Sequence, residues 1–272
     1  MGDPFELVSS SYSLIKKWIS LDAKIIVGFT TRNGGISKGI FSGNNLGLHV
    51  GDRDEHVIQN RTILADQLNF PLNRWVFAEQ IHNDYVHFVT EKDRGAGVIK
   101  YTASIRHCDG LYTNTAGTML ALCFADCVPV YFFAPEEKMI GIVHAGWRGT
   151  VKNIIRSLID AWRKRDIRPE KIFAAIGPSI CNQCFIVDNK VIDQVCKLPI
   201  ADAGRFFTRV EKGQYALDLK GLNKELLLNE GLPEENILIS NYCTSCDNNF
   251  FSHRREKGQT GRMIGFIGIE EA

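Results

Sequence analysis

The stretch Thr118-Met-Leu-Ala-Leu-Cys-Phe-Ala-Asp-Cys-Val-Pro-Val-Tyr-Phe-Phe-Ala134 decides the fold, because two apolar segments meet in it at a polar pair, Asp126 and Cys127. Segments 118–125 and 128–134 have the length and composition of buried strands. Neither segment alternates apolar with polar residues, so we expect both faces of each strand to be covered. The chain is therefore predicted to have layers on both sides of its central strands.

Seven further segments are rich in β-branched and aromatic residues and are predicted to be strands: 24–30, 75–78, 85–90, 138–144, 171–176, 236–241 and 263–269. Four segments carry helical spacing or helix-end signals and are predicted to be helices: 55–68, 150–165, 188–197 and 218–230. Strands and helices mix without strict alternation, which favours an α+β fold over a doubly wound one. We expect a mixed β-sheet flanked by helices.

Length and composition exclude several classes of protein. The 272 residues carry 32 Lys and Arg against 31 Asp and Glu, a net charge of +1, so the chain lacks the basic field of a dedicated nucleic-acid binder. No apolar run is long enough to cross a bilayer and no signal peptide is evident, so we expect a cytoplasmic protein. No repeat or linker interrupts residues 1–272, a length that fits one large domain as well as two.

Three predicted strands lead to a residue that can bind a metal ion. One strand leads to His82, a second to Cys127, and a third ends in His144. Strand ends present side chains to a crevice, so neighbouring strands would bring two imidazoles and a thiolate together. Zn²⁺ prefers these ligands, and three of them leave a position for water or substrate. Copper also fits the ligand types, and Gln80 and Asp126 are polar companions of the set.

The turn His144-Ala-Gly-Trp-Arg-Gly-Thr150 joins a predicted strand to a predicted helix. Its glycines permit a tight turn, and the N–H groups at the start of the helix can bind an anion. Arg148 can add a bidentate contact to phosphate or carboxylate. We therefore predict an anion site beside the metal. Residues 30–51 form a second predicted binding segment, a turn-rich loop with polar groups at Arg32, Asn45 and His49.

Two other groups of residues are not expected to take part in the reaction. Cys181 and Cys184 form a Cys-x-x-Cys pair, as do Cys243 and Cys246, but a zinc ribbon needs its two pairs much closer together in sequence. We therefore expect free thiols, with a structural zinc as the disfavoured alternative. The run His253-Arg254-Arg255 is expected to be a solvated surface.

Ten short stretches occur in this order along the chain: Phe29-Thr-Thr-Arg-Asn-Gly-Gly35, Asn45-Leu-Gly-Leu-His-Val-Gly-Asp52, Asn60-Arg61, Glu79-Gln-Ile-His82, Asp109-Gly-Leu-Tyr-Thr113, Ala125-Asp-Cys-Val-Pro129, His144-Ala-Gly-Trp-Arg-Gly149, Ile176-Gly-Pro178, Cys243-Thr244 and Phe250-Phe-Ser-His-Arg-Arg255. By these stretches the sequence resembles the laccase-domain family, the purine nucleoside phosphorylases once described as polyphenol oxidases. The resemblance covers essentially the whole chain, and the blocks at 125–129 and 144–149 are highly specific together. One departure is His253, which stands where many relatives carry Tyr.

The resemblance implies one α+β domain with a metal centre of two His and one Cys, a role that it carries onto His82, Cys127 and His144. It also implies phosphorolysis of adenosine, inosine and methylthioadenosine, with adenosine deaminase as a side activity. The expected partners are a purine nucleoside and inorganic phosphate, and the expected state is a monomer or a small homo-oligomer.

Phosphorolysis requires a phosphate held against the ribose while the purine departs. Arg148 and Asp126 are the expected catalytic residues, Arg148 as a phosphate ligand and Asp126 to orient a ligand or shuttle a proton. Arg61 is expected to share the phosphate with Arg148. The expected substrate-binding residues are Asn45, Arg61, Gln80 and Asp109.

Three alternatives stay open. The ligand types would also suit a copper-dependent polyphenol oxidase of the laccase type. A Cys127 thiol activated by His82 or His144 would suit a Cys–His hydrolase that needs no metal. A non-catalytic binding module is the third alternative.

Overall fold

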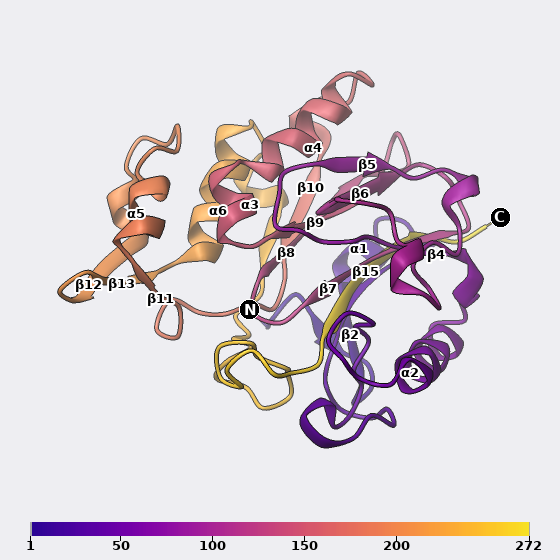
Figure 1. Ribbon diagram of the computed structural model, residues 1–272. Coiled ribbons are helices and arrows are strands. Elements are labelled where there is room, and N and C mark those ends of the chain that lie inside the picture. The colour runs from indigo at the N-terminus through magenta and orange to yellow at the C-terminus, as the bar shows by residue number, and fades with distance from the viewer. Residues whose placement is uncertain (1, 272) are drawn as a thin grey trace.

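Strand β7 (Thr118–Phe124) has no face exposed to solvent, because its side chains enter two separate cores in alternation. Leu120 and Leu122 pack into the core between the two large sheets, whereas Met119 packs on the opposite face, in the core beneath helix α2 (Asp54–Gln67). The predicted covering of both strand faces is confirmed. The structure is a computed structural model and describes residues 2–271 (Figure 1).

Two six-stranded mixed sheets share this central core, and a small antiparallel sheet lies at the periphery with α5 (Asn189–Val195) (Figure 1). The first sheet has the order β1 (Glu6–Leu7), β2 (Tyr12–Leu14), β3 (Ile25–Thr30), β15 (Met263–Ile269), β7, β4 (Trp75–Phe77). The second has the order β14 (Ile237–Ile239), β10 (Phe173–Ile176), β8 (Val128–Ala134), β9 (Met139–Ala145), β6 (Gly110–Thr113), β5 (Val86–Phe88). The small sheet has the order β11 (Ile186–Asp188), β13 (Gln214–Leu217), β12 (Phe207–Glu211).

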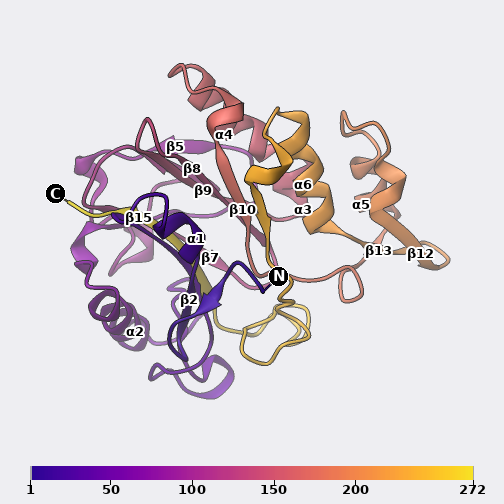
Figure 2. The ribbon, with the colours of Figure 1, turned by 180° about the vertical axis from the view of Figure 1, so that it is seen from behind.

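Helices cover the outer faces of the two large sheets, as the view from behind also shows (Figure 2). Helix α2 covers the first sheet, and α4 (Ile154–Arg163) and α6 (Leu219–Asn229) cover the second. A Cβ on Gly141 of β9 would lie 2.9 Å from Leu158 Cδ1, which shows how closely α4 approaches the sheet. Two short helices, α1 (Lys16–Ile19) and α3 (Trp147–Val151), complete the set. Among residues 2–271, every helix is too short or too polar to span a bilayer.

The α+β class, the nine predicted strands and the helical segments are confirmed, with shifts at their ends. The expectation of one mixed sheet is corrected, because the strands divide into three sheets. The predicted helix 150–165 is two helices, since Asn153 interrupts it with a left-handed φ of 59°. Its side chain accepts a hydrogen bond from the backbone N–H of Arg156 at 3.1 Å and so starts α4. The six strands that were not predicted are short, with two to five residues each.

The connections between strands bring the three predicted metal ligands to one edge. The chain passes from β7 of the first sheet directly into β8 of the second, so residues 125–127 cross between the sheets. Strand β9 is antiparallel to β8, which places His144 opposite Pro129, near the start of β8. Strand β4 is parallel to β7, so the loop after β4 that carries His82 leaves at the edge where β7 ends.

Candidate metal centre and pocket

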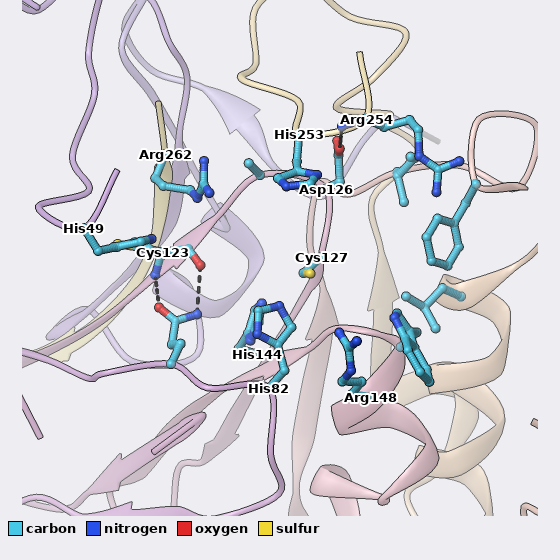
Figure 3. A pocket seen from close by; sticks show the side chains of 16 residues that line it. His49, His82, Cys123, Asp126, Cys127, His144, Arg148, His253, Arg254 and Arg262 are labelled. Carbon is cyan, nitrogen blue, oxygen red and sulfur yellow. Dashed lines mark hydrogen bonds between the residues drawn. The ribbon is translucent and has the colours of Figure 1, made fainter. Parts of the chain in front are cut away.

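His82, Cys127 and His144 converge where the two sheets meet (Figure 3). One ligand atom from each residue lies within 4.8 Å of the other two. The two imidazole rings meet edge to face with their centroids 4.7 Å apart. Two imidazoles and a thiolate at this range have the donor set of a three-ligand metal site, with a position left for water or substrate. The structure thus brings the three predicted ligands together.

The buried carboxylate of Asp109 positions both histidines. It accepts hydrogen bonds from the backbone N–H groups of Ile81, His82 and Asn83 at 3.0, 3.0 and 2.9 Å, and it lies 2.8 Å from His144 Nδ1. Burial opposes ionisation of Asp109, but the hydrogen bonds from His144, Asn83 and Ile81 outweigh it, so its pKa is lowered. An ionised Asp109 keeps the proton of His144 on Nδ1, which leaves Nε2 as the ligand atom.

Charge pairing favours the thiolate of Cys127. Burial opposes this form, but the imidazoles of His144 and His82 outweigh burial and lower the pKa of the Cys127 thiol. Burial likewise opposes protonation of His144, but Cys127 and Asp109 raise its pKa above the ordinary value. Gly146 leaves room for the sulfur, because a Cβ there would lie 2.9 Å from Cys127 Sγ. The thiolate is the form that binds metals and the form that acts as a nucleophile.

The three ligands form part of the wall of a cavity of about 480 Å³. This volume is typical of pockets that hold small organic molecules. Aromatic and basic side chains also line the cavity, including His49, Trp147, Arg148, Phe185, Arg254 and Arg262. In Figure 3 the metal-ligand set lies between His49 and Arg262 on one side and Arg148 on the other.

Arg148 and Gln80, two of the predicted site residues, line this cavity. The guanidinium of Arg148 lies 4.6 Å from the ring centroid of Trp147, and the side chain is exposed to the cavity. Both polar atoms of the Gln80 side chain form hydrogen bonds with the backbone of Cys123. The amide nitrogen donates to the carbonyl at 2.9 Å, and the amide oxygen accepts from the N–H at 2.7 Å. The helix beside Arg148 begins at Trp147, not at Thr150 as predicted, and has only five residues. Its N-terminus therefore contributes little to an anion site.

Arg61 is not in the cavity, and its predicted contact with phosphate is wrong. The side chain is 3 % exposed, and its guanidinium donates four hydrogen bonds of 2.7 to 2.9 Å, to the carbonyls of Leu46, Gly97 and Val98. It also lies 3.7 Å from the ring centroid of Phe77. Arg61 therefore joins α2 to two loops, and backbone carbonyls take four of its five N–H donors.

Asn45 and Asp109 also have structural roles in place of the predicted substrate contacts. Both side chains are fully buried, and neither lines the cavity. Asn45 donates to Asp52 Oδ2 at 2.9 Å and accepts the backbone N–H groups of Gly47 and Arg262 at 3.1 and 2.8 Å. Asp109 lies behind His144, as described above, and acts through the two histidines.

Asp126 lines the cavity, but its carboxylate is committed to a neighbouring loop. Oδ1 accepts a hydrogen bond from Thr244 Oγ1 at 2.6 Å, and Oδ2 accepts from Ser252 Oγ at 3.0 Å and from the backbone N–H of Arg254 at 2.7 Å. Three donors on two oxygens favour a role in positioning residues 244–254 over the predicted transfer of a proton.

The sequence predictions missed several cavity residues, among them Arg262, Arg254 and its neighbour His253. Arg262 precedes β15, whose first residue, Met263, lies opposite Phe124 at the end of β7. The start of an antiparallel strand shares an edge with the end of its neighbour, so a residue before β15 reaches the edge where β7 ends. Arg254 was expected on a solvated surface, yet it lines the cavity and donates to the carbonyl of Ile186 at 2.9 Å. No local pattern distinguishes it from a surface residue.

His49 belongs to the loop predicted to bind ligands, and it lines the cavity. The residue is partly exposed to solvent, and desolvation in the cavity wall lowers its pKa to about 4, together with the cations Arg262 and Arg61. It is therefore neutral near pH 7. Arg32, from the same loop, instead pairs with Glu256 at 2.6 Å.

Several known proteins are similar to this chain over nearly its whole length. Residues 26–270 match the model of the family described as multi-copper polyphenol oxidoreductase laccase. Purine nucleoside phosphorylase YlmD of Bacillus subtilis is 44% identical over 274 residues, which cover 99% of this chain and 98% of that protein. Its namesake from Geobacillus stearothermophilus is 47% identical over 251 residues and 92% of each chain.

Two solved structures have the same fold as this chain. The crystal structure of the hypothetical protein YfiH of Bacillus licheniformis superposes with a TM-score of 0.96 at 45% identity, covering 99% of this chain and 100% of that chain. That of YlmD from Geobacillus stearothermophilus superposes with a TM-score of 0.93 at 43% identity and the same coverage.

Proposed function

Since this chain belongs to the laccase-domain family, we propose that it is a purine nucleoside phosphorylase with a zinc ion held by His82, Cys127 and His144. The observation that carries the proposal is the convergence of these side chains at a cavity that arginines also line. The proposed substrates are adenosine, inosine and methylthioadenosine, each converted by phosphate into a free base and a sugar 1-phosphate. Deamination of adenosine is proposed as a side activity of the same site.

The donor set supports zinc as the metal. Imidazole and thiolate are its preferred ligands, and Asp109 orients His144 as carboxylates orient histidine ligands in zinc sites. When bound there, zinc would supply Lewis-acid chemistry, polarising an oxygen of the substrate or the phosphate, or activating water for the deamination.

Arg148 is proposed to bind the phosphate. Its guanidinium is exposed to the cavity beside the metal ligands. Stacking on Trp147 fixes the plane of the guanidinium, whose N–H groups can donate two parallel hydrogen bonds to a phosphate. Arg262 lies on the other side of the metal-ligand set. The two cations would hold the phosphate against the ribose C1′ while negative charge develops on the departing purine.

The nucleoside is proposed to use the apolar part of the cavity. Ile180, Phe185 and Leu219 line that part. An apolar wall supports a purine ring and keeps water from competing with phosphate at C1′. The side-chain amide of Gln80 already forms two hydrogen bonds with the backbone of Cys123. Gln80 would therefore contact the nucleoside only through the edge of this amide group.

The test is an assay of purified, zinc-loaded protein with adenosine and phosphate. We expect adenine and ribose 1-phosphate, with no adenine when phosphate is omitted, and a smaller amount of inosine. The variant Cys127→Ser should lose activity and the metal ion of this centre, whereas Cys196→Ser, at an exposed thiol outside the cavity, should keep both. A zinc-loaded protein that releases no base from any of the three nucleosides would reject the proposal.

The family description favours one alternative, a copper-dependent phenol oxidase. Phenol oxidation by the protein as isolated, dependent on bound copper and on oxygen, would support it. A second alternative rests on the favoured thiolate of Cys127. A metal-free native protein in which iodoacetamide rapidly alkylates Cys127 would support a Cys–His hydrolase instead.

A further inference from the structure

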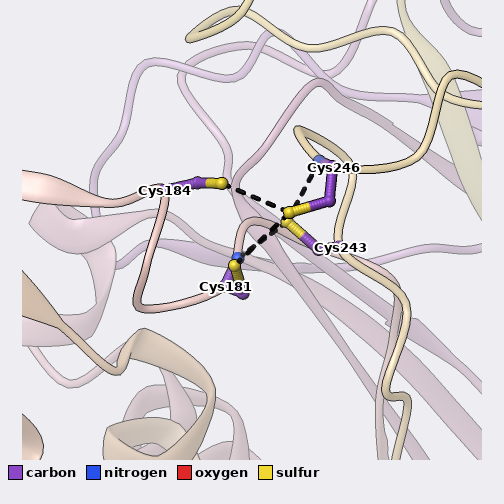
Figure 4. A group of neighbouring side chains, drawn as sticks. All are labelled: Cys181, Cys184, Cys243 and Cys246. Atoms are coloured by element: carbon purple, nitrogen blue, oxygen red, sulfur yellow. Dashed lines mark hydrogen bonds between the residues drawn. The ribbon is translucent and has the colours of Figure 1, made fainter.

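Four cysteines outside the cavity converge in space, although they are far apart in sequence (Figure 4). Cys181 and Cys184 come from one loop, and Cys243 and Cys246 come from another. One ligand atom from each lies within 4.8 Å of all the others. The expectation that the two Cys-x-x-Cys pairs lie too far apart to cooperate is therefore corrected.

Parallel pairing of β10 with β14 brings the two loops together. Ile176 lies opposite Ile239, and the pairing continues beyond the strands through a bridge between Ser179 and Cys243. Parallel strands end at the same edge of a sheet, so the loops that follow them leave side by side. Each loop carries a Cys-x-x-Cys pair just after this point.

The distances between sulfur atoms fit a tetrahedral ion better than a disulfide. Cys246 Sγ lies 3.4 Å from Cys184 Sγ and 3.9 Å from Cys181 Sγ. A disulfide joins its sulfurs at about 2.0 Å. Four thiolates at the usual Zn–S distance of about 2.3 Å stand about 3.8 Å apart at the corners of a tetrahedron. The observed separations lie on both sides of that value.

The surroundings of Cys243 favour a negatively charged sulfur at this corner of the cluster. The backbone N–H groups of Cys181 and Cys246 point at Cys243 Sγ, at 3.2 and 3.4 Å. Lys220 of α6 is 9 % exposed, and its ammonium donates to the carbonyls of Ser240 and Tyr242, the latter directly before Cys243. Backbone donors and a buried cation offset part of the charge of four thiolates around a divalent ion.

We propose that Cys181, Cys184, Cys243 and Cys246 bind one structural zinc ion, separate from the centre at His82, Cys127 and His144. Binding replaces the thiol protons, which pass to solvent, and involves no change of oxidation state. All four coordination positions are filled by sulfur, so no position is open to a substrate, as in other structural zinc sites.

This ion would tie together two loops that form one side of the cavity. Ile180 and Phe185, which flank the first Cys pair, both line the cavity. Thr244, inside the second pair, donates to Asp126 at 2.6 Å. Arg254 donates to the carbonyl of Cys184 at 3.3 Å. The zinc site thus fixes the cavity wall without contacting a ligand in the cavity.

Metal analysis of the protein as isolated tests the proposal. We expect about two zinc ions per chain in the native protein and in Cys196→Ser, and about one in the double variant Cys184→Ser/Cys246→Ser. Cys127→Ser should also retain about one, held by the other cluster. Zinc content in the double variant equal to that of Cys196→Ser would overturn the proposal, and so would a disulfide among these four cysteines in the native protein.

Cobalt substitution provides a second measurement that leaves the four cysteines intact. Cobalt-loaded Cys127→Ser should show the intense sulfur-to-metal charge-transfer absorption and visible bands of a tetrahedral thiolate site. Absence of these bands would overturn the proposal even if the double variant does not fold. Phosphorolysis does not enter either readout, so failure of the four-cysteine site leaves the proposed function standing, and the reverse also holds.

Discussion

The Asp109 carboxylate lies 2.8 Å from His144 Nδ1 and also accepts the backbone N–H of His82, so one buried acid orients the imidazole of His144 and holds the backbone that carries His82. The two histidines come from different sheets, since His82 follows β4 and His144 lies in β9. Asp109 itself directly precedes β6, the neighbour of β9. The geometry of the site therefore depends on a residue that does not face the cavity.

Replacing Asp109 by Asn should weaken metal binding about ten-fold to a hundred-fold. The variant loses the negative charge that holds the His144 proton on Nδ1, and an amide offers fewer acceptors to the three N–H groups of residues 81–83. Competition with a chelating dye measures the affinity. Asp66→Asn, at an exposed position of α2, is the matched control. Equal affinities in the two variants would contradict the role given to Asp109.

Arg148→Met should raise the KM for phosphate about ten-fold or more, because a hydrogen bond to a charged group is worth about 1.5 kcal/mol or more. The KM for the nucleoside should change much less. Initial rates at varied phosphate measure the effect. Arg156→Met is the control, since Arg156 is exposed on α4 and pairs with Asp160 outside the cavity. A similar small change in both variants would exclude Arg148 as the phosphate ligand.

Arg61→Met should destabilise the fold by about 3 kcal/mol, since it leaves the carbonyls of Leu46, Gly97 and Val98 without their buried donor. Its effect on the KM for phosphate should be small in the protein that remains folded. Urea denaturation measures the loss as a lower midpoint at an unchanged slope. Arg53→Met, at an exposed position, should leave the midpoint unchanged. An unchanged midpoint for Arg61→Met would contradict the structural role.

His49 should stay neutral down to about pH 5, because desolvation in the cavity wall and the cations Arg262 and Arg61 lower its pKa to about 4. The unfolded chain takes up this proton near its ordinary pKa of 6.5. The stability that neutral His49 contributes is therefore complete above pH 6.5 and is lost as the pH falls from there toward 4. NMR titration of the histidine ring protons, assigned with His49→Gln, measures the pKa. A value near 6.5 in the folded protein would refute the prediction.

The sequence predicted the three metal ligands because each stands where an apolar strand ends, and the composition of a strand is visible locally. His82, Cys127 and His144 follow from this local pattern without any knowledge of strand pairing. Pairing is a tertiary property, so residues that depend on it were missed. Arg262 reaches the cavity only because β15 is antiparallel to β7, and the four-cysteine cluster forms only because β10 is parallel to β14.

Polar residues in loops and helices were harder to assign than strand ends. Asn45 and Arg61 carry the same groups that would bind a sugar or a phosphate, and in the structure they satisfy buried backbone groups instead. Burial decides between these roles, and it depends on how distant segments pack. Asp126 shows a mixed outcome, because it lines the predicted site but uses its oxygens on residues 244–254.

Residues 125–127 cross from the first sheet to the second, and the other two metal ligands come from one sheet each. A metal ion at this junction would link the two large sheets to each other. The sheets could then move relative to one another only after the ion is released. Thermal unfolding would then be linked to free metal concentration. Removal of metal by a chelator should lower the melting temperature, and titration with zinc should restore it in the native protein but only partly in Cys127→Ser.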